Sequence, residues 1–289
     1  FQDLGCLSCD TGYGVWSEPA GSNLLVKGNT CSEIQKNHIT GKFGDLKALN
    51  NTLSGQGPVI TTSQYGILLS NGATGVVLNN TVSGFNFTPA GTESAGIALV
   101  NAANGLTISG NTLSGNELGI FVDPTNSGKI LSNTIFSSAG SDMVIENSSG
   151  WLVTLNKMNG SLGKGLVLTN VSNTQVISNT FSNTAEEAVL LQSMAGSSNN
   201  NQFIQNTLTG IQGDGMKLFM DGTPGNTASG NSFVSNTIQN GLGNGVRMDA
   251  VGANRFANTV FKANKIRDNQ KTGLITERSN TATIEFNTI

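Results

Sequence analysis

The chain has 289 residues, a formal net charge of −3 and only 11% charged residues, while 37 of its residues are glycine. This balance argues against a nucleic-acid partner, because the phosphates would need a basic stripe on the protein. No apolar run approaches the roughly 20 residues that a membrane-spanning helix needs, and no signal peptide is recognisable. The abundance of Asn, Ser and Thr favours an extracellular or cell-surface protein, with the periplasm as the alternative.

The three cysteines lie near the N-terminus, at Cys6, Cys9 and Cys31. Cys6 and Cys9 have the spacing of half a redox or metal motif. The chain has no second such pair and its single histidine is His38, so the sequence does not supply the four ligands of a zinc site. Cys31 stands where the repeat described below places an inward apolar side chain. We therefore expect residues 1–45 to form an N-terminal cap with the first coils, stiffened by one disulfide of open pairing beside a buried thiol, and we expect no resident cofactor.

From residue 46 to residue 289 the chain repeats two short phrases. The first is Asn, usually Thr, and then an apolar residue; its asparagines are Asn51, Asn80, Asn111, Asn133, Asn156, Asn179, Asn206, Asn236, Asn264 and Asn287. The second is Gly followed by alternating apolar residues. It begins at Gly66, Gly96, Gly119, Gly165, Gly215, Gly245 and Gly273, with Asp142 and Ala188 in the glycine place of two further units. A fixed period of this size predicts the stacked coils of a solenoid.

The two phrases are evenly spaced in the middle of the chain. Gly119 to Asn133 is 14 residues and Asn133 to Asp142 is 9, and both intervals recur in the next two units, so one coil has about 23 residues. Polarity alternates with period 2 inside each unit, as strands require. We expect an all-β rod of roughly ten coils with three parallel strands each, about 45–50 Å long. The chain stops within a repeat, so we expect residues 46–289 to form a β-helix that is open at its C-terminal end and belongs to a fragment or a processed chain.

The alternation assigns ten side chains of neighbouring coils to the interior: Ile97, Leu99, Ile120, Val122, Met143, Ile145, Leu166, Leu168, Val189 and Leu191. The asparagines have a physical role of their own, because Asn tolerates left-handed backbone and suits a sharp bend between strands. Stacked about 4.8 Å apart, their amides can also bond one another along the axis. The Asn phrase therefore predicts a bend and an amide ladder.

Through its Asn-Thr-apolar and Gly-apolar-x-apolar phrases, the chain from about Gly14 to Ile289 resembles the pectin-lyase-like parallel β-helix repeat superfamily. The resemblance is strongest to its branch of periplasmic copper proteins and carbohydrate-associated proteins, and it implies a right-handed, single-stranded parallel β-helix (β-solenoid). That superfamily includes polysaccharide lyases, hydrolases, epimerases, phage tailspikes and adhesins. The resemblance therefore implies a polysaccharide or glycan partner without naming one activity.

Two residues after the glycine place, six consecutive coils carry an apolar residue on the outward side: Leu68, Ala98, Phe121, Val144, Val167 and Leu190. We call this file the outer apolar column. Contiguous exposed apolar surface usually marks an interface. The sequence leaves open whether a partner subunit covers the column in a homo-oligomer or filament, whether segment 85–95 of the same chain covers it, or whether it is bare.

Three neighbouring coils are longer than the others. The interval between the two phrases grows from 14 residues to 18, 21 and 19, which places insertions at residues 194–201, 221–228 and 251–258. Because the insertions fall in the same segment of adjacent coils, we expect them to stack into a wall beside a groove. Variable loops on a rigid scaffold are where sites are commonly built.

In these longer coils the outward column turns charged at Lys217 and Arg247, with Asp221 and Asp249 close by, and all four are candidate substrate-binding residues. Two cations stacked about 5 Å apart repel, which favours a neutral lysine. A lyase or C5-epimerase of uronic-acid polymers needs a base and a positive charge against the carboxylate. Lys217 is then the candidate catalytic base and Arg247 the neutraliser, while the aspartates could orient the arginine or hold Ca²⁺. The alternative is a solvated face of alternating charges.

Three functions remain open. The favoured one is a secreted or surface-exposed rod, part of a fibre, adhesin or spike, that contacts glycans or its own copies. The second is the polysaccharide-modifying enzyme. The third is ice binding, suggested by the file of outward threonines that Lys157 and Lys265 interrupt. The rod is favoured because catalysis needs at least two convergent titratable groups, and the Glu186-Glu187 pair is expected in a tight, solvent-facing turn.

Overall fold

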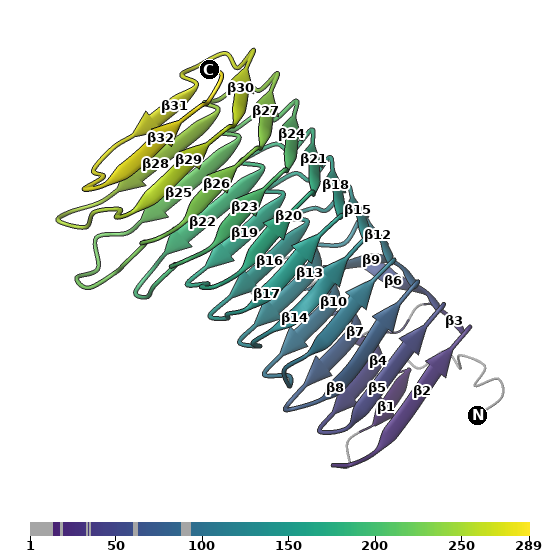
Figure 1. The fold of residues 1–289 in the computed structure, drawn as a ribbon. Helices are drawn as coiled ribbons and strands as arrows, with labels where there is room; N and C mark the ends of the chain where they lie inside the picture. The colour runs from purple at the N-terminus through teal and green to yellow at the C-terminus, as the bar shows by residue number, and fades with distance from the viewer. Residues whose placement is uncertain (1–13, 18–19, 33, 35, 60–62, 88–93) are drawn as a thin grey trace.

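The structure is a computed structural model that describes residues 14–17, 20–32, 34, 36–59, 63–87 and 94–289. The chain winds as a right-handed parallel β-helix in which each coil adds one strand to each of three parallel sheets (Figure 1). Within the described residues all regular elements are strands, and none is a helix that could cross a membrane. The all-β solenoid expected from the repeat is confirmed.

Each sheet runs the length of the rod, and its neighbouring strands are three apart in chain order. Sheet A contains β1 (Val15–Ser17), β4 (Asn37–Lys42), β7 (Tyr65–Ser70), β10 (Ala95–Val100), β13 (Leu118–Asp123), β16 (Met143–Glu146), β19 (Leu166–Thr169), β22 (Val189–Ser193), β25 (Met216–Met220), β28 (Val246–Ala250) and β31 (Leu274–Thr276). Sheet B contains β2 (Asn23–Lys27), β5 (Asp45–Leu49), β8 (Thr74–Leu78), β11 (Leu106–Ser109), β14 (Gly128–Leu131), β17 (Trp151–Thr154), β20 (Gln175–Ile177), β23 (Gln202–Ile204), β26 (Ser232–Val234), β29 (Thr259–Lys262) and β32 (Ala282–Glu285). Sheet C contains β3 (Thr30–Ser32), β6 (Thr52–Val59), β9 (Thr81–Phe87), β12 (Thr112–Ser114), β15 (Thr134–Phe136), β18 (Lys157–Asn159), β21 (Thr180–Ser182), β24 (Thr207–Thr209), β27 (Thr237–Gln239) and β30 (Lys265–Arg267).

The interior is a continuous file of apolar side chains. The ten residues that the alternation assigns to it, from Ile97 to Leu191, are each at most 2% exposed, which confirms the register. Cys31 is 3% exposed and stacks on Leu53 of the next coil, at the inward position expected for it. Cys6 and Cys9 lie outside the described residues.

A ladder of amides runs along the axis beside this core. In each step the backbone N and Nδ2 of one Asn donate to Oδ1 of the Asn in the next coil, as from Asn133 to Asn156 at 2.9 Å for both bonds. The residue with left-handed backbone is the one before the ladder Asn, for example Ser132 (φ 53°) and Leu155 (φ 58°), and the expectation that the Asn itself makes the bend is wrong. The preceding residue also donates its N–H to the next coil, as Leu155 N does to Ile177 O at 3.2 Å, so the bend leaves the hydrogen bonding between coils unbroken.

The outer apolar column forms a cluster separate from the core. Its six side chains are at most 9% exposed in the single chain, because they stack on one another and on Ala95 and Leu118. Of segment 85–95, which was expected to cover the column, Ala95 packs on it, Phe85 packs in the core against His38, and residues 88–93 lie outside the described residues. A partner could therefore remove little further apolar area from this column.

The three insertions follow β22, β25 and β28 at one edge of sheet A, where Figure 1 shows long loops beside these strands. Backbone bonds tie them together, with Ser198 N donating to Thr227 O at 2.9 Å and Ala257 N donating to Ala228 O at 3.2 Å. Asn254 adds a side-chain bond from Nδ2 to Thr223 O at 3.1 Å. The insertions thus stack as a wall at the edge of sheet A.

Candidate functional site

The candidate site lies on the outer face of sheet A, where the outer apolar column ends. Strands β22, β25 and β28 and the residues just before them carry nine side chains, which we call the sheet A site: Glu187, Leu190, Gln192, Asp214, Lys217, Phe219, Asn244, Arg247 and Asp249. Parallel register puts Leu190, Lys217 and Arg247 in one row along the axis. It puts Gln192, Phe219 and Asp249 in the next. Strict coil stacking therefore turns positions about thirty residues apart into neighbours.

Lys217 is paired with a carboxylate. Its Nζ lies 3.8 Å from Oε1 of Glu187 and 5.5 Å from the centroid of the Phe219 ring. Glu187 also reaches back one coil, with Oε2 at 3.6 Å from Nζ of Lys164, and its side chain is only 17% exposed rather than facing solvent as expected. The catalytic-base hypothesis depends on repulsion between Lys217 and the stacked Arg247. The Glu187 carboxylate beside Lys217 offsets that repulsion.

Arg247 has a carboxylate of its own. Its Nη2 donates to Oδ2 of Asp249 at 3.2 Å, while its Nε is buried without a hydrogen-bond partner in the part of the chain that the structure describes. At the edge of the site, Oδ1 of Asp214 accepts from backbone N and Nδ2 of Asn244 at 2.8 and 2.7 Å, which fixes the carboxylate. The structure thus brings Lys217, Arg247 and Asp249 together, with each cation already charge-paired.

Asp221 is placed differently from the other three candidate residues. Its carboxylate accepts from backbone N and Oγ1 of Thr223, at 3.0 and 3.1 Å, and from Nδ2 of Asn226. These bonds, led by the one from the Thr223 backbone, hold the pKa of Asp221 below its usual value. Asp249 lies opposite Phe219, whereas Asp221 follows the end of β25, so the two aspartates occupy different rows. The visible role of Asp221 is to hold the turn that begins its loop.

Sequence reasoning did not assign five of the polar and aromatic members of this site: Glu187, Gln192, Asp214, Phe219 and Asn244. A signal for them exists, because they stand one residue before or four residues after the glycine place of their coils. Only the row two residues after that place was followed as a column. Reading the flanking offsets would have found the remaining rows.

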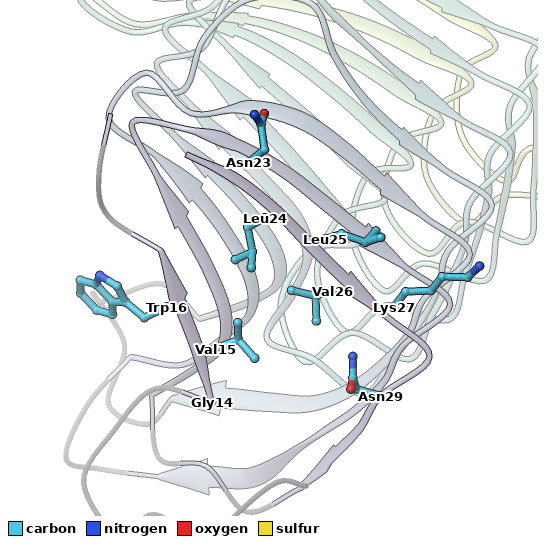
Figure 2. A pocket seen from close by; sticks show the side chains of 9 residues that line it. All are labelled: Gly14, Val15, Trp16, Asn23, Leu24, Leu25, Val26, Lys27 and Asn29. Atoms are coloured by element: carbon cyan, nitrogen blue, oxygen red, sulfur yellow. The ribbon is translucent and has the colours of Figure 1, made fainter. Parts of the chain in front are cut away.

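A cavity of about 610 Å³ lies elsewhere, at the N-terminal end of the rod (Figure 2). Val15, Leu24 and Val26, which line it, pair in register with the buried Ile39, Leu46 and Ala48 of the next coil. Figure 2 shows Trp16 pointing away from the hollow. The cavity is therefore the end of the apolar core seen along the axis, and it lies far from the charged residues of the sheet A site.

Asp142 and His38 are ionisable side chains that the coils enclose within the described part of the chain. Asp142, in the glycine place, is fully buried, Oδ1 accepts from Oγ of Ser138 at 2.8 Å, and burial raises the pKa of Asp142 to about 7. His38 is also fully buried, its ring centroid is 4.7 Å from that of Phe85, and burial lowers its pKa to about 4. Burial thus favours the uncharged form of both groups and keeps them away from any surface site.

Solved structures with the same architecture include an alginate epimerase and a tailspike protein. A single-residue mutant of the periplasmic alginate epimerase AlgG superposes with a TM-score of 0.68 at 12% identity, over 91% of this chain and 76% of that one. The structure of AlgG without a substitution gives 0.59 at 13% identity over 91% and 76%. The Dettilon tailspike protein (gp208) gives 0.58 at 13% identity over 85% and 54%. At these identities the likeness shows the fold alone. No curated protein matches the chain by sequence.

The family described as periplasmic copper-binding protein (NosD) matches residues 5–141 and 49–249, which is more than half of the chain. Among the described residues, which leave out Cys6 and Cys9, no three side chains of His, Cys, Asp or Glu converge. Cys31 is buried in the apolar file. By that match this chain belongs to the NosD family.

Proposed function

We propose that this chain is a glycan-contacting β-helix that works outside the cytoplasm, as a rod in a fibre, adhesin or spike, and that the sheet A site is its binding face. One observation carries the proposal. The outer apolar column of sheet A, which runs from Leu68 to Leu190, gives way in the same row to Lys217 and Arg247, in coils where long loops stack beside the sheet. The superposable alginate epimerase supports a polysaccharide partner, and the superposable tailspike supports a role as a spike. The epimerase and the family description support a periplasmic or extracellular location.

The scaffold suits such a role because it is rigid where the site sits. The amide ladder continues through these coils, with Asn206 bonding Asn236 and Asn236 bonding Asn264 at 2.9–3.0 Å. Side chains on such strands are held in fixed rows, and a polymer lying along the axis meets one row after another. Several weak contacts then act together on one chain of sugars.

The test is binding to a panel of soluble polysaccharides, both acidic and neutral, measured by affinity electrophoresis. The double variant Lys217→Ala/Arg247→Ala should lose most of the retardation that the wild type shows. The matched control is Lys157→Ala/Lys265→Ala, which removes two exposed lysines from sheet C and should bind as the wild type does. Equal binding by all three proteins would place the contact elsewhere on the rod.

A uronate lyase or C5-epimerase is the second candidate, and the stacking of Lys217 directly on Arg247 is what favours it. Lys217 would take the C5 proton and Arg247 would neutralise the sugar carboxylate. The ion pair between Lys217 and Glu187 opposes this, because the base must be free to accept a proton. Alginate and pectate incubated with the protein should then show the absorbance of an unsaturated uronate, or C5 inversion by NMR, and Lys217→Ala should abolish either. Unchanged polymers would eliminate this candidate while leaving binding untouched.

A further inference from the structure

The sheet A site has no excess of positive charge. Its three carboxylates, Glu187, Asp214 and Asp249, outnumber the two cations Lys217 and Arg247, so its formal charge is −1. The adjoining pair of Lys164 and Glu186, which are in contact, leaves that balance unchanged. A polyanion would have to displace these carboxylates or lie beside them, and neighbouring like charges repel each other. The charge balance therefore disfavours an acidic polymer.

An aromatic ring lies in the middle of the same face. Phe219 points outward between Gln192 and Asp249 in register, since its neighbours Leu218 and Met220 are buried in the core. It is partly exposed and packs on the edge of the outer apolar column, which ends next to it at Leu190. The C–H faces of sugar rings are apolar and flat, so an outward aromatic ring offers them a platform without needing charge.

The groups around Phe219 suit hydroxyl partners. Carboxylates accept hydrogen bonds from hydroxyls, the guanidinium of Arg247 donates in a plane, and the Gln192 amide can do both. The pair Arg247–Asp249 lies on one side of the ring, and Gln192 lies on the other with its Nε2 bonded to Thr169 Oγ1 at 2.9 Å. Donors and acceptors thus lie on both sides of the Phe219 ring along the axis, and Lys217 Nζ lies 5.5 Å from the ring centroid.

Resting on the proposed function, we infer that the ligand of the sheet A site is an uncharged, hydroxyl-rich glycan, with one sugar ring packed on Phe219 and its hydroxyls bonded to the Arg247–Asp249 pair. The ion pairs are then the binding groups themselves, and Glu187 and Asp249 act as selectors against acidic polymers.

The experiment compares neutral polymers (dextran, galactomannan and hydroxyethylcellulose) with acidic ones (alginate and pectate) by calorimetric titration of the full chain. The wild type should bind at least one neutral polymer, with an affinity that changes little between about 0.02 M and about 0.5 M salt, because no net charge is screened. Phe219→Ala should weaken that binding roughly three- to tenfold, the range expected for losing one aromatic contact. The matched control is Phe136→Ala, which removes a partly exposed phenylalanine from the outer face of sheet C and should change nothing. Glu187→Gln/Asp249→Asn should increase binding of the acidic polymers at low salt.

The outcomes separate this inference from the proposed function. Salt-sensitive binding of alginate or pectate without neutral binding overturns the inference and leaves the proposed function intact. Neutral binding that is equal in wild type and Phe219→Ala, with unchanged circular dichroism, overturns the placement of the sugar on Phe219. Absence of binding to any polymer rejects the proposed function and this inference with it.

Discussion

Asp142 leads to a prediction of how stability depends on pH, because its carboxyl group occupies a position that glycine fills in most other coils. Its side chain is fully buried, and Oδ2 has no hydrogen-bond partner within the described residues. Burial raises its pKa from 3.8 to about 7, although the bond from Ser138 acts in the opposite direction. The folded state therefore keeps a proton that the unfolded chain has already released.

The direction and size of the pH effect on stability follow from the difference between the unfolded and folded pKa values of Asp142. Below pH 3.8 both states hold the proton and the group has no pH-dependent effect, whereas between 3.8 and about 7 stability falls as the pH rises. Above that range the loss is complete, at about 4 kcal/mol, since each pH unit between the two pKa values is worth about 1.4 kcal/mol. Asp142→Asn keeps the shape and the acceptor for Ser138 but removes the titration.

Urea unfolding followed by circular dichroism, at about pH 4 and about pH 8, measures this effect directly. The free energy of unfolding of Asp142→Asn relative to wild type should be higher by about 4 kcal/mol at the upper pH than at the lower one. Asp268→Asn is the matched control, because the Asp268 side chain is 66% exposed, and it should shift both values by less than about 0.5 kcal/mol. An Asp142→Asn difference that is the same at both pH values would refute the reasoning.

Three further predictions concern the core and assembly. Burial lowers the pKa of His38 from 6.5 to about 4, so the free energy of unfolding should fall by about 3 kcal/mol as the pH drops through this range. His38→Leu should abolish this loss, which thermal melting at acid pH measures. Leu168→Asp should prevent folding, because a charge would lie unpaired in the apolar core, whereas Leu155→Asp at a 59% exposed position should fold. Soluble yield and circular dichroism measure whether each variant folds. A folded Leu168→Asp protein would contradict the assigned register. If the outer apolar column holds subunits together, Phe121→Lys/Val167→Lys should reduce the mass seen by light scattering, whereas an unchanged monomeric mass in both proteins excludes that interface.

The β-helix coils could be predicted from the sequence because each coil repeats the same short pattern of residues. Alternation inside a phrase such as the one from Ile120 to Val122 decides which side chains face inward, and the spacing of the phrases sets which coils are neighbours. For the same reason Lys217 could be placed beside Arg247, and Cys31 in the core, without any coordinates.

The tertiary structure decided what lies beside each row and what each polar group contacts. Nothing in the local sequence of Glu187 distinguishes a solvent-facing turn from a side chain held between Lys164 and Lys217, because the pairing depends on three coils stacked in register. The bend before each ladder Asn could not be read either, because residues as different as Ser132 and Leu155 take the left-handed position. The repeat in the sequence thus determined the scaffold, while the site came from contacts between coils, which only the stacked chain creates.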